Sequence, residues 1–266
     1  MKQKILLIIT LIIGSVFALP MILTITNSFM TPEEIMMNQQ RIPLIPQKLS
    51  LRQYYTLLLE RSEYLGMFWK SVVCTGCIVI GNSLYSIFVG SMLAKIRMKG
   101  KTLILLLYII GILIPYQVNM IPYYIQFKLM NLLESDIALI LPMIVAPFGV
   151  VVVTFMVRSV PDELIEAIRL ETNGLYYIFK DAIFPTCKGG ITILIIFIFA
   201  EAWNMVEQPM TVYSDLYKQP LSVLLSTMQY DINIVFAACV VYMIPVIISY
   251  FFFEESLDEE FLQIRV

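Results

Sequence analysis

The chain has 266 residues, of which 59% are hydrophobic and only 14% are charged, and its mean hydropathy is +0.82. A soluble domain carries about a quarter charged residues, so lipid must solvate part of this surface. The net charge of −2, with no basic patch interleaved with aromatic residues, argues against nucleic-acid binding. Histidine is absent, and no nucleophile–base or metal-ligand constellation is visible, so we expect no catalytic residue and no metal site.

Six apolar segments are long enough to cross a bilayer, which requires roughly 20 apolar residues per helix. They cover residues 5–26, 71–94, 102–127, 137–157, 189–206 and 234–253, and Glu201 in the fifth is their only charged side chain. Pro115 and Pro122 are expected to kink or end the third helix. The sequence therefore predicts an all-α membrane protein with six transmembrane helices in a single domain over residues 1–266.

The first segment has a second interpretation. Ser15–Ala18 supplies small residues that suit the cleavage site of a signal peptide. The 22-residue apolar length favours a retained membrane span instead. Within the second segment, Cys74 and Cys77 form a CxxC, but no second thiol pair accompanies them, so they are expected to be packing residues.

Lysine and arginine placement predicts the orientation, because basic connections stay in the cytoplasm. Basic residues concentrate before the first span and in the second and fourth connections: Lys2, Lys4, Lys95, Arg97, Lys99, Lys101, Arg158, Arg169, Lys180 and Lys188. The third and fifth connections hold only Lys128 and Lys218. We expect both termini and the even-numbered connections to be cytoplasmic.

The fourth connection, residues 158–188, is too long for a simple hairpin and predicts a helix–turn–helix. Pro161 suits the first helical position, and Asp162 and Glu163 complement the helix dipole. An apolar stripe follows at helical spacing: Leu164, Ile165, Ala167, Ile168 and Leu170. Thr172, Asn173 and Gly174 interrupt this helix, and a second one is expected from Leu175 to Pro185. The apolar face either docks into a partner's groove or rests on the headgroups or its own bundle.

Short motifs in this connection resemble the EAA loop of binding-protein-dependent ABC transporter permeases. They are Glu166-Ala167, Gly174, Ile178-Phe179, Ile183 and Pro185. Flanking motifs are similar to those of the maltose-type carbohydrate permeases: Ile121-Pro122-Tyr123-Tyr124, Ile140-Leu141-Pro142, Pro147-Phe148, Val160-Pro161-Asp162-Glu163-Leu164 and Trp203-Asn204. The similarity extends from Lys70 to Leu225. Ile168, Glu171 and Thr172 depart from the family's usual Ala, Asp and Gly, so Asn173 or Gly174 is expected to take the left-handed position of the turn.

The resemblance implies a permease subunit of an ATP-driven ABC importer in a bacterial plasma (inner) membrane, with a sugar or an oligosaccharide as its cargo. Its implied partners are a second homologous permease, two cytoplasmic ATP-binding subunits and an extracellular solute-binding protein. No cofactor is expected in this chain, because Gly100-Lys101-Thr102 only mimics a phosphate-binding loop and Lys95 replaces its first glycine. ATP and magnesium would bind the partner ATPase. A permease of the same fold for a peptide, glycan or exported product is the alternative; a gradient-driven carrier would need a charge relay within the spans.

Two sets of candidate site residues follow. For the ATPase-coupling loop, the resemblance implies that Glu166 is a charged anchor and that Ala167 and Gly174 allow close approach. The side chains that would fill the cleft of the ATP-binding subunit are Leu164, Ile168 and Phe179. The whole set is Pro161, Leu164, Glu166, Ala167, Ile168, Gly174, Phe179 and Pro185. For the substrate path, polar residues within the spans are candidates: Asn82, Tyr116, Gln117, Asn119, Trp203 and Asn204. For the amides in this second set, hydrogen bonding between helices is favoured over contact with the substrate.

Overall fold

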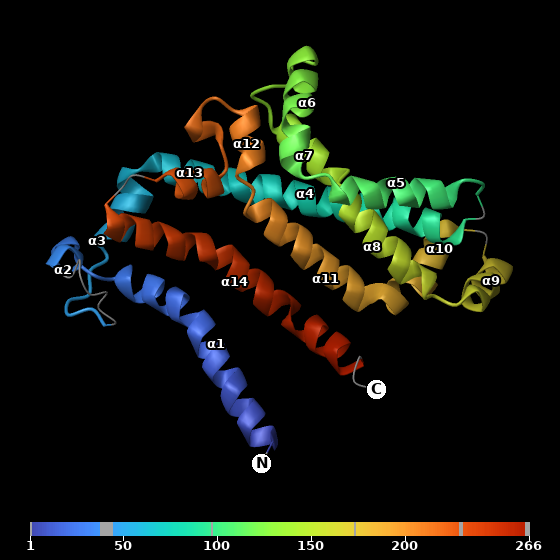
Figure 1. The fold of residues 1–266 in the computed structure, drawn as a ribbon, viewed down its shortest axis with the longest axis horizontal. Helices are drawn as coiled ribbons and strands as arrows, with labels where there is room; N and C mark the ends of the chain where they lie inside the picture. Colours follow the sequence, from blue (N-terminus) through green and yellow to red (C-terminus); the bar gives the residue numbers. More distant parts are fainter. Residues whose placement is uncertain (1, 38–44, 97, 173, 229–230, 264–266) are drawn as a thin grey trace.

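The computed structural model describes residues 2–37, 45–96, 98–172, 174–228 and 231–263, and Figure 1 shows them as a helical bundle. In these ranges there is no β-strand, which confirms the predicted all-α class. The helices of the first half are α1 (Lys2–Asn27), α2 (Pro32–Met37), α3 (Arg52–Tyr55), α4 (Ser62–Lys95), α5 (Lys101–Leu113), α6 (Tyr116–Leu129) and α7 (Asp136–Ile144). Those of the second half are α8 (Pro147–Arg158), α9 (Asp162–Glu171), α10 (Leu175–Ile178), α11 (Phe184–Trp203), α12 (Glu207–Val212), α13 (Leu221–Thr227) and α14 (Ile232–Gln263).

Five helical stretches of the described chain are long and apolar enough to cross a membrane. They are Lys4–Asn27, Ser62–Lys95, Asp136–Arg158, Tyr176–Trp203 and Ile232–Glu254. The third predicted segment, 102–127, is not one straight helix: α5 and α6 meet at a bend of 101°. Ile114 and Pro115 at the bend are extended, because a residue before proline avoids the helical conformation. Pro115 therefore ends a helix as expected, whereas Pro122 lies within α6.

The second loop helix does not end where it was predicted to end. Pro185 was expected to end the second loop helix, but it lies in the first turn of α11, where a missing N–H is tolerated. A π-helical turn, η2 (Phe179–Ile183), joins α10 directly to α11. The second loop helix and the fifth span are thus continuous, and the span ends at Trp203 rather than at residue 206.

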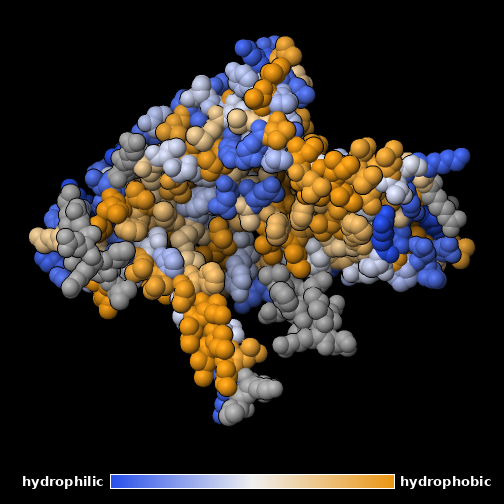
Figure 2. Space-filling view, in the orientation of Figure 1, coloured by the Kyte–Doolittle hydropathy of each residue, from blue (hydrophilic) through white to orange (hydrophobic). Residues whose placement is uncertain are grey.

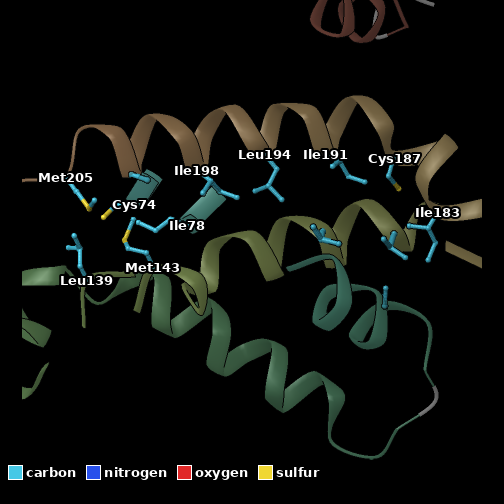
Figure 3. Close-up of a cluster of buried hydrophobic side chains, with 14 of the residues drawn as sticks. Cys74, Ile78, Leu139, Met143, Ile183, Cys187, Ile191, Leu194, Ile198 and Met205 are labelled. Atoms are coloured by element: carbon cyan, nitrogen blue, oxygen red, sulfur yellow. The ribbon is translucent and has the colours of Figure 1, made fainter. Parts of the chain in front are cut away.

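The main core contains side chains of α4, α7, α8 and α11, and within it α11 packs on α4 and α8. Figure 3 shows side chains three or four residues apart that extend from the end of η2 along one side of α11: Ile183, Cys187, Ile191, Leu194 and Ile198. Cys74 and Ile78 of α4 and Met143 of α7 lie in the same cluster. The spacing of Cys187, Ile191, Leu194 and Ile198 places them on one face of α11, which explains why that face is buried.

Glycines let α4 approach α7 and α8 closely. A Cβ on Gly90 would lie 2.8 Å from the Val153 Cβ and 3.0 Å from the Val150 carbonyl oxygen. A Cβ on Gly81 would lie 2.6 Å from the Ile144 side chain. Small residues at such contacts are typical of packed membrane helices, because they bring the backbones together. The α4 and α7–α8 segments therefore form one closely packed pair.

Helix α1 stands apart from this core and contacts α14. In its most apolar 18-residue stretch no side chain is buried inside the protein. Figure 2 shows the helix as a hydrophobic column extending from the body of the molecule. A helix that is apolar all round needs lipid or another protein around it, so this exposure supports the membrane assignment.

Candidate functional site

A hollow of about 350 Å³ opens where two helix breaks face each other. One break is the α5–α6 bend at Pro115, and the other is the α7–α8 junction at Ala146 and Pro147. The end of α11 supplies Glu201 to the wall. Other polar or aromatic lining residues are Tyr116, Asn119, Tyr123, Phe148 and Gln208. Broken helices within a membrane are tolerated where they border such a space, because the freed backbone groups need partners.

A second hollow of about 290 Å³ adjoins the first and shares Tyr116, Glu201 and Gln208 with it. Its wall adds Asn204 and Glu207. Together the two hollows combine aromatic faces, amides and two carboxylates. The described residues on their walls include no lysine or arginine. Such a wall offers many acceptors for hydroxyl donors and repels anions.

Glu207 also links α12 to α6. The Gln117 side-chain amide donates to both of its carboxylate oxygens, at 2.9 and 2.8 Å. Gln117 and Glu207 also line a third hollow of about 610 Å³. The bridge therefore lies on the wall of this hollow, which shares Glu207 with the hollow of about 290 Å³.

The structure separates the predicted path residues into two groups. Tyr116, Asn119 and Asn204 line the hollows of about 350 and 290 Å³, and Gln117 bonds to Glu207. Asn82 and Trp203 belong to neither wall. Asn82 is buried and donates to the Met143 carbonyl at 2.7 Å, which is the helix–helix role favoured for the amides.

Trp203 is a core residue. Its ring is almost completely buried and stacks on Tyr242 at 5.1 Å and on Phe199 at 5.9 Å. The Tyr242 hydroxyl donates to the Trp203 carbonyl at 2.8 Å. The ring therefore holds α11 against α14 and does not face the hollow.

Two wall residues, Glu207 and Gln208, were not among the predicted path residues. Glu201, the only charged residue of its predicted span, lies on the walls of both hollows. Glu207 is the first acidic residue after Trp203-Asn204, but only the helical turn of α12 brings it to the wall.

The face that α9 turns outward differs from the predicted one. Ile165 is 3% exposed, and Ile168 packs against the core of the same chain. On the opposite face of the helix lie Glu166, Ala167 and Leu170, and the Leu170 side chain is 89% exposed. Ile168 was expected to fill a partner's cleft, but its contacts are internal.

Other residues of this loop also differ from expectation. Phe179 is partly buried against the same core and packs on Phe184, so it too is an internal contact, while Leu164 remains exposed. Pro161 precedes the helix, and Asp162 and Glu163 occupy its first turn.

The turn after α9 begins at Thr172. The Thr172 backbone is extended, and its N–H donates to the Ile168 carbonyl at 2.8 Å, which closes the helix. Gly174 does not have a positive φ, so it does not take the predicted left-handed position. The other candidate for that position, Asn173, lies outside the described residues.

A polar cluster holds the segment after α12 at the end of the bundle opposite α9. Lys70 pairs with Asp136 at 2.9 Å, and its ammonium lies 4.1 Å from the centre of the Tyr213 ring. The Tyr213 hydroxyl donates to Asp136. The Glu134 carboxylate accepts from the Ser214 hydroxyl at 2.6 Å and its N–H at 2.8 Å, and these bonds hold the pKa of Glu134 below its ordinary value.

Comparison with known proteins identifies the family. The family described as binding-protein-dependent transport system inner membrane component matches residues 86–262, which is more than half of the chain. The chain belongs to this family of ABC transporter permeases. The members are membrane subunits of transport systems rather than enzymes.

Similar proteins carry the names of several transport systems. The arabinooligosaccharides transport system permease protein AraQ of Halalkalibacterium halodurans is 29% identical over 91% of this chain and 88% of its own length. Protein LplC of Bacillus subtilis is 28% identical over 80% of this chain and 70% of its own. The sn-glycerol-3-phosphate permease protein UgpE of Yersinia pestis is 26% identical over 56% of this chain and 53% of its own.

A solved structure supports the fold. It is a bacterial ABC transporter involved in the import of the acidic polysaccharide alginate. It superimposes with a TM-score of 0.82 at 18% identity, over 96% of this chain and 97% of that one. The overall helical arrangement is thus that of an ABC importer permease.

Proposed function

We propose that this chain is the permease subunit of an ATP-driven ABC importer for a sugar or an oligosaccharide. The chemistry of the hollows of about 350 and 290 Å³ supports the substrate class in this proposal. Tyr116 offers an aromatic face, and Asn119 and Asn204 offer amides that both donate and accept. Apolar and aromatic walls with a few converging polar groups are typical of small-molecule sites, and this combination suits a ring with a C–H face and many hydroxyls.

The charges on the wall narrow the substrate class. Glu201 and Glu207 accept hydrogen bonds from hydroxyls and repel anions. An uncharged saccharide fits this wall better than an anion, such as the sn-glycerol-3-phosphate named for UgpE or the acidic polysaccharide named for the alginate transporter. The name of AraQ, a permease for arabinooligosaccharides, points in the same direction. A peptide, a glycan or an exported product is the alternative cargo.

Helix α9 is the proposed site of coupling to a separate ATPase. The outward face of α9 combines an exposed leucine, a small alanine and a carboxylate: Leu170, Ala167 and Glu166. An exposed apolar side chain on a short helix is suited to a groove on another protein. The observation that carries this proposal is the exposure of Leu170 on a helix whose other face is packed against its own bundle.

Coupling requires that the ATPase distinguish two permease conformations. A partner that binds both equally well shifts neither. In the proposed cycle, ATP and magnesium bind two copies of the ATPase, whose closed form favours one conformation of this chain and of a second, homologous permease. A solute-binding protein delivers the cargo on the other side of a bacterial plasma membrane. The termini and α9 are cytoplasmic in this proposal, in agreement with the basic residues of the second and fourth connections.

One paired substitution tests the coupling site. Leu170→Asp should abolish co-purification of the ATPase and ATP-driven uptake, because a charge replaces the leucine in the groove. Leu129→Asp is the matched control: Leu129, at the end of α6, is 78% exposed and receives the same change away from α9. Normal assembly and uptake by the Leu170→Asp complex would contradict the coupling role of α9.

The substrate class is tested in proteoliposomes that contain the complete complex. Uptake of a neutral pentose oligosaccharide, its uronate analogue and a short peptide should be compared in the presence of ATP. We expect uptake of the neutral saccharide and none of the others. Uptake of the peptide alone would favour the alternative cargo.

A further inference from the structure

The last residue of α4 contacts the beginning of α9. The Lys95 ammonium donates to the Val160 carbonyl at 2.5 Å and to an Asp162 carboxylate oxygen at 2.7 Å. Only 13% of the Lys95 side chain is exposed, and Val160 is buried. A lysine far along the chain thus binds both the α8–α9 junction, at Val160, and the first residue of α9, Asp162.

This junction is otherwise a short non-helical connection. Helix α8 ends at Arg158 and α9 begins at Asp162, so Ser159, Val160 and Pro161 lie between them. A force applied to α9 can rotate it about such a joint instead of moving α8. Lys95 connects the joint to α4, and the two contacts oppose this rotation.

Helix α4 extends from Lys95 to the wall of the hollow. Gly90 packs against Val153 of α8, one and a half turns from Lys95 along a helix of 3.6 residues per turn. Farther along α4, Asn82 donates to the carbonyl of Met143, which lines the hollow of about 350 Å³. The packed pair therefore connects the α9 junction to the wall of the candidate substrate site.

We propose that Lys95 is a positioning residue that makes α9 move as one body with α4 and α8, so that displacement of α9 reaches the hollow. The inference rests on the proposed coupling role of α9. Discrete packed elements of this kind carry coupling between distant sites when both sites bias the same element. Without Lys95, α9 still docks on the ATPase, but its displacement is partly lost at the junction.

The two contacts of Lys95 do not contribute equally. Asp162 is 78% exposed at its side chain, and exposed ion pairs contribute little. The Val160 carbonyl is at a buried position, where an unpaired polar group is unfavourable. The bond to Val160 is therefore the principal one, and loss of the Asp162 carboxylate should matter less.

The test is the number of substrate molecules transported per ATP hydrolysed by the purified complex in proteoliposomes. For Lys95→Met we expect normal binding of the ATPase, continued ATP hydrolysis and a transport-to-hydrolysis ratio lowered about tenfold, within the usual range of allosteric coupling. Asp162→Asn should lower the ratio by no more than about twofold, as expected for an exposed pair. Lys99→Met is the matched control, because Lys99 is exposed in the loop that follows α4 and its replacement removes the same charge.

A wild-type ratio in the Lys95→Met complex would overturn the inference. Should this variant fail to accumulate in the membrane, Lys95→Gln decides: its shorter side chain is uncharged, and the same lowered ratio is expected from it. Failure of the wild-type chain to bind the ATPase, or to transport with ATP, would instead contradict the proposed function. The two failures are therefore distinguishable.

Discussion

The side-chain amide of Asn82 supplies the hydrogen bond that Pro147 cannot donate to the Met143 carbonyl. In a continuous helix, the N–H of residue 147 would bond to the carbonyl of residue 143, but proline has no N–H. Asn82 of α4 donates to that carbonyl at 2.7 Å and accepts from the Ser86 hydroxyl at 3.0 Å. The break that opens the hollow is thus stabilised from the neighbouring helix.

Asn82→Ala should therefore destabilise the fold. It removes the shorter of two hydrogen bonds to the Met143 carbonyl, which also accepts from the Ala146 N–H at 3.4 Å, so the cost should be about 0.5–1.5 kcal/mol. The measurement is thermal unfolding of the purified chain in detergent, where the variant should have a lower Tm. An unchanged Tm would show that another donor replaces the amide.

Gly149 lies where α8 approaches the same asparagine. A Cβ at this position would come within 2.7 Å of the Asn82 side-chain oxygen and 3.0 Å of the Ser86 Cβ. Gly149→Ala should lower the stability by about 1–3 kcal/mol, the usual cost of overpacking a core. Gly76→Ala in α4 is the control, because no atom lies within 4 Å of its added Cβ. Equal Tm values for the two variants would contradict the close α4–α8 contact.

Local sequence features predict where helices run and where they break. Apolar length located the spans, and Pro115 marked the bend, because both effects act within a few residues. The orientation of a side chain depends on what packs beside its helix. Ile168 and Leu170 are both apolar residues of one stripe, but only the tertiary fold turns the first inward and the second outward.

The same distinction applies to the candidate site. Asn119 and Trp203 both met the criterion of a polar or aromatic residue within a span. Asn119 lines the hollow, because it follows the bend by one turn. Trp203 turns toward Tyr242, a residue 39 positions later, and a contact of that range is not encoded in local periodicity.

Glu134 should make the attachment of the segment after α12 depend on pH. The pKa of Glu134 lies below its ordinary value. The main cause is the hydrogen bond from the Ser214 hydroxyl, and the second is the bond from the Ser214 N–H. A group with a lowered pKa stabilises the native contact above its ordinary pKa, and this contribution is lost as the pH falls through the native value. The contact should be complete at pH 7 and weakened under strongly acidic conditions.

Hydrogen exchange of the Ser214 amide, corrected for the intrinsic effect of pH, measures this attachment. Protection should fall on acidification in the wild-type chain. In Glu134→Gln the acidic fall should be smaller, because the amide oxygen still accepts but does not titrate in this range. Equal pH dependence in both proteins would assign the effect to another group.

Substitutions at Trp203 and Asn119 should separate stability from transport. Trp203→Ala removes a buried ring that packs between α11 and α14, and large aromatic-to-alanine changes in cores cost about 3–5 kcal/mol. Its main effect should be a lower Tm and a lower yield from the membrane. Asn119→Ala, on the wall of the hollow, should change the free energy of unfolding by no more than about 0.5 kcal/mol, so that the Tm stays near the wild-type value. It should nevertheless reduce uptake. The two measurements on each variant are Tm in detergent and ATP-driven uptake; reduced uptake by Trp203→Phe at wild-type Tm would place the ring on the substrate path after all.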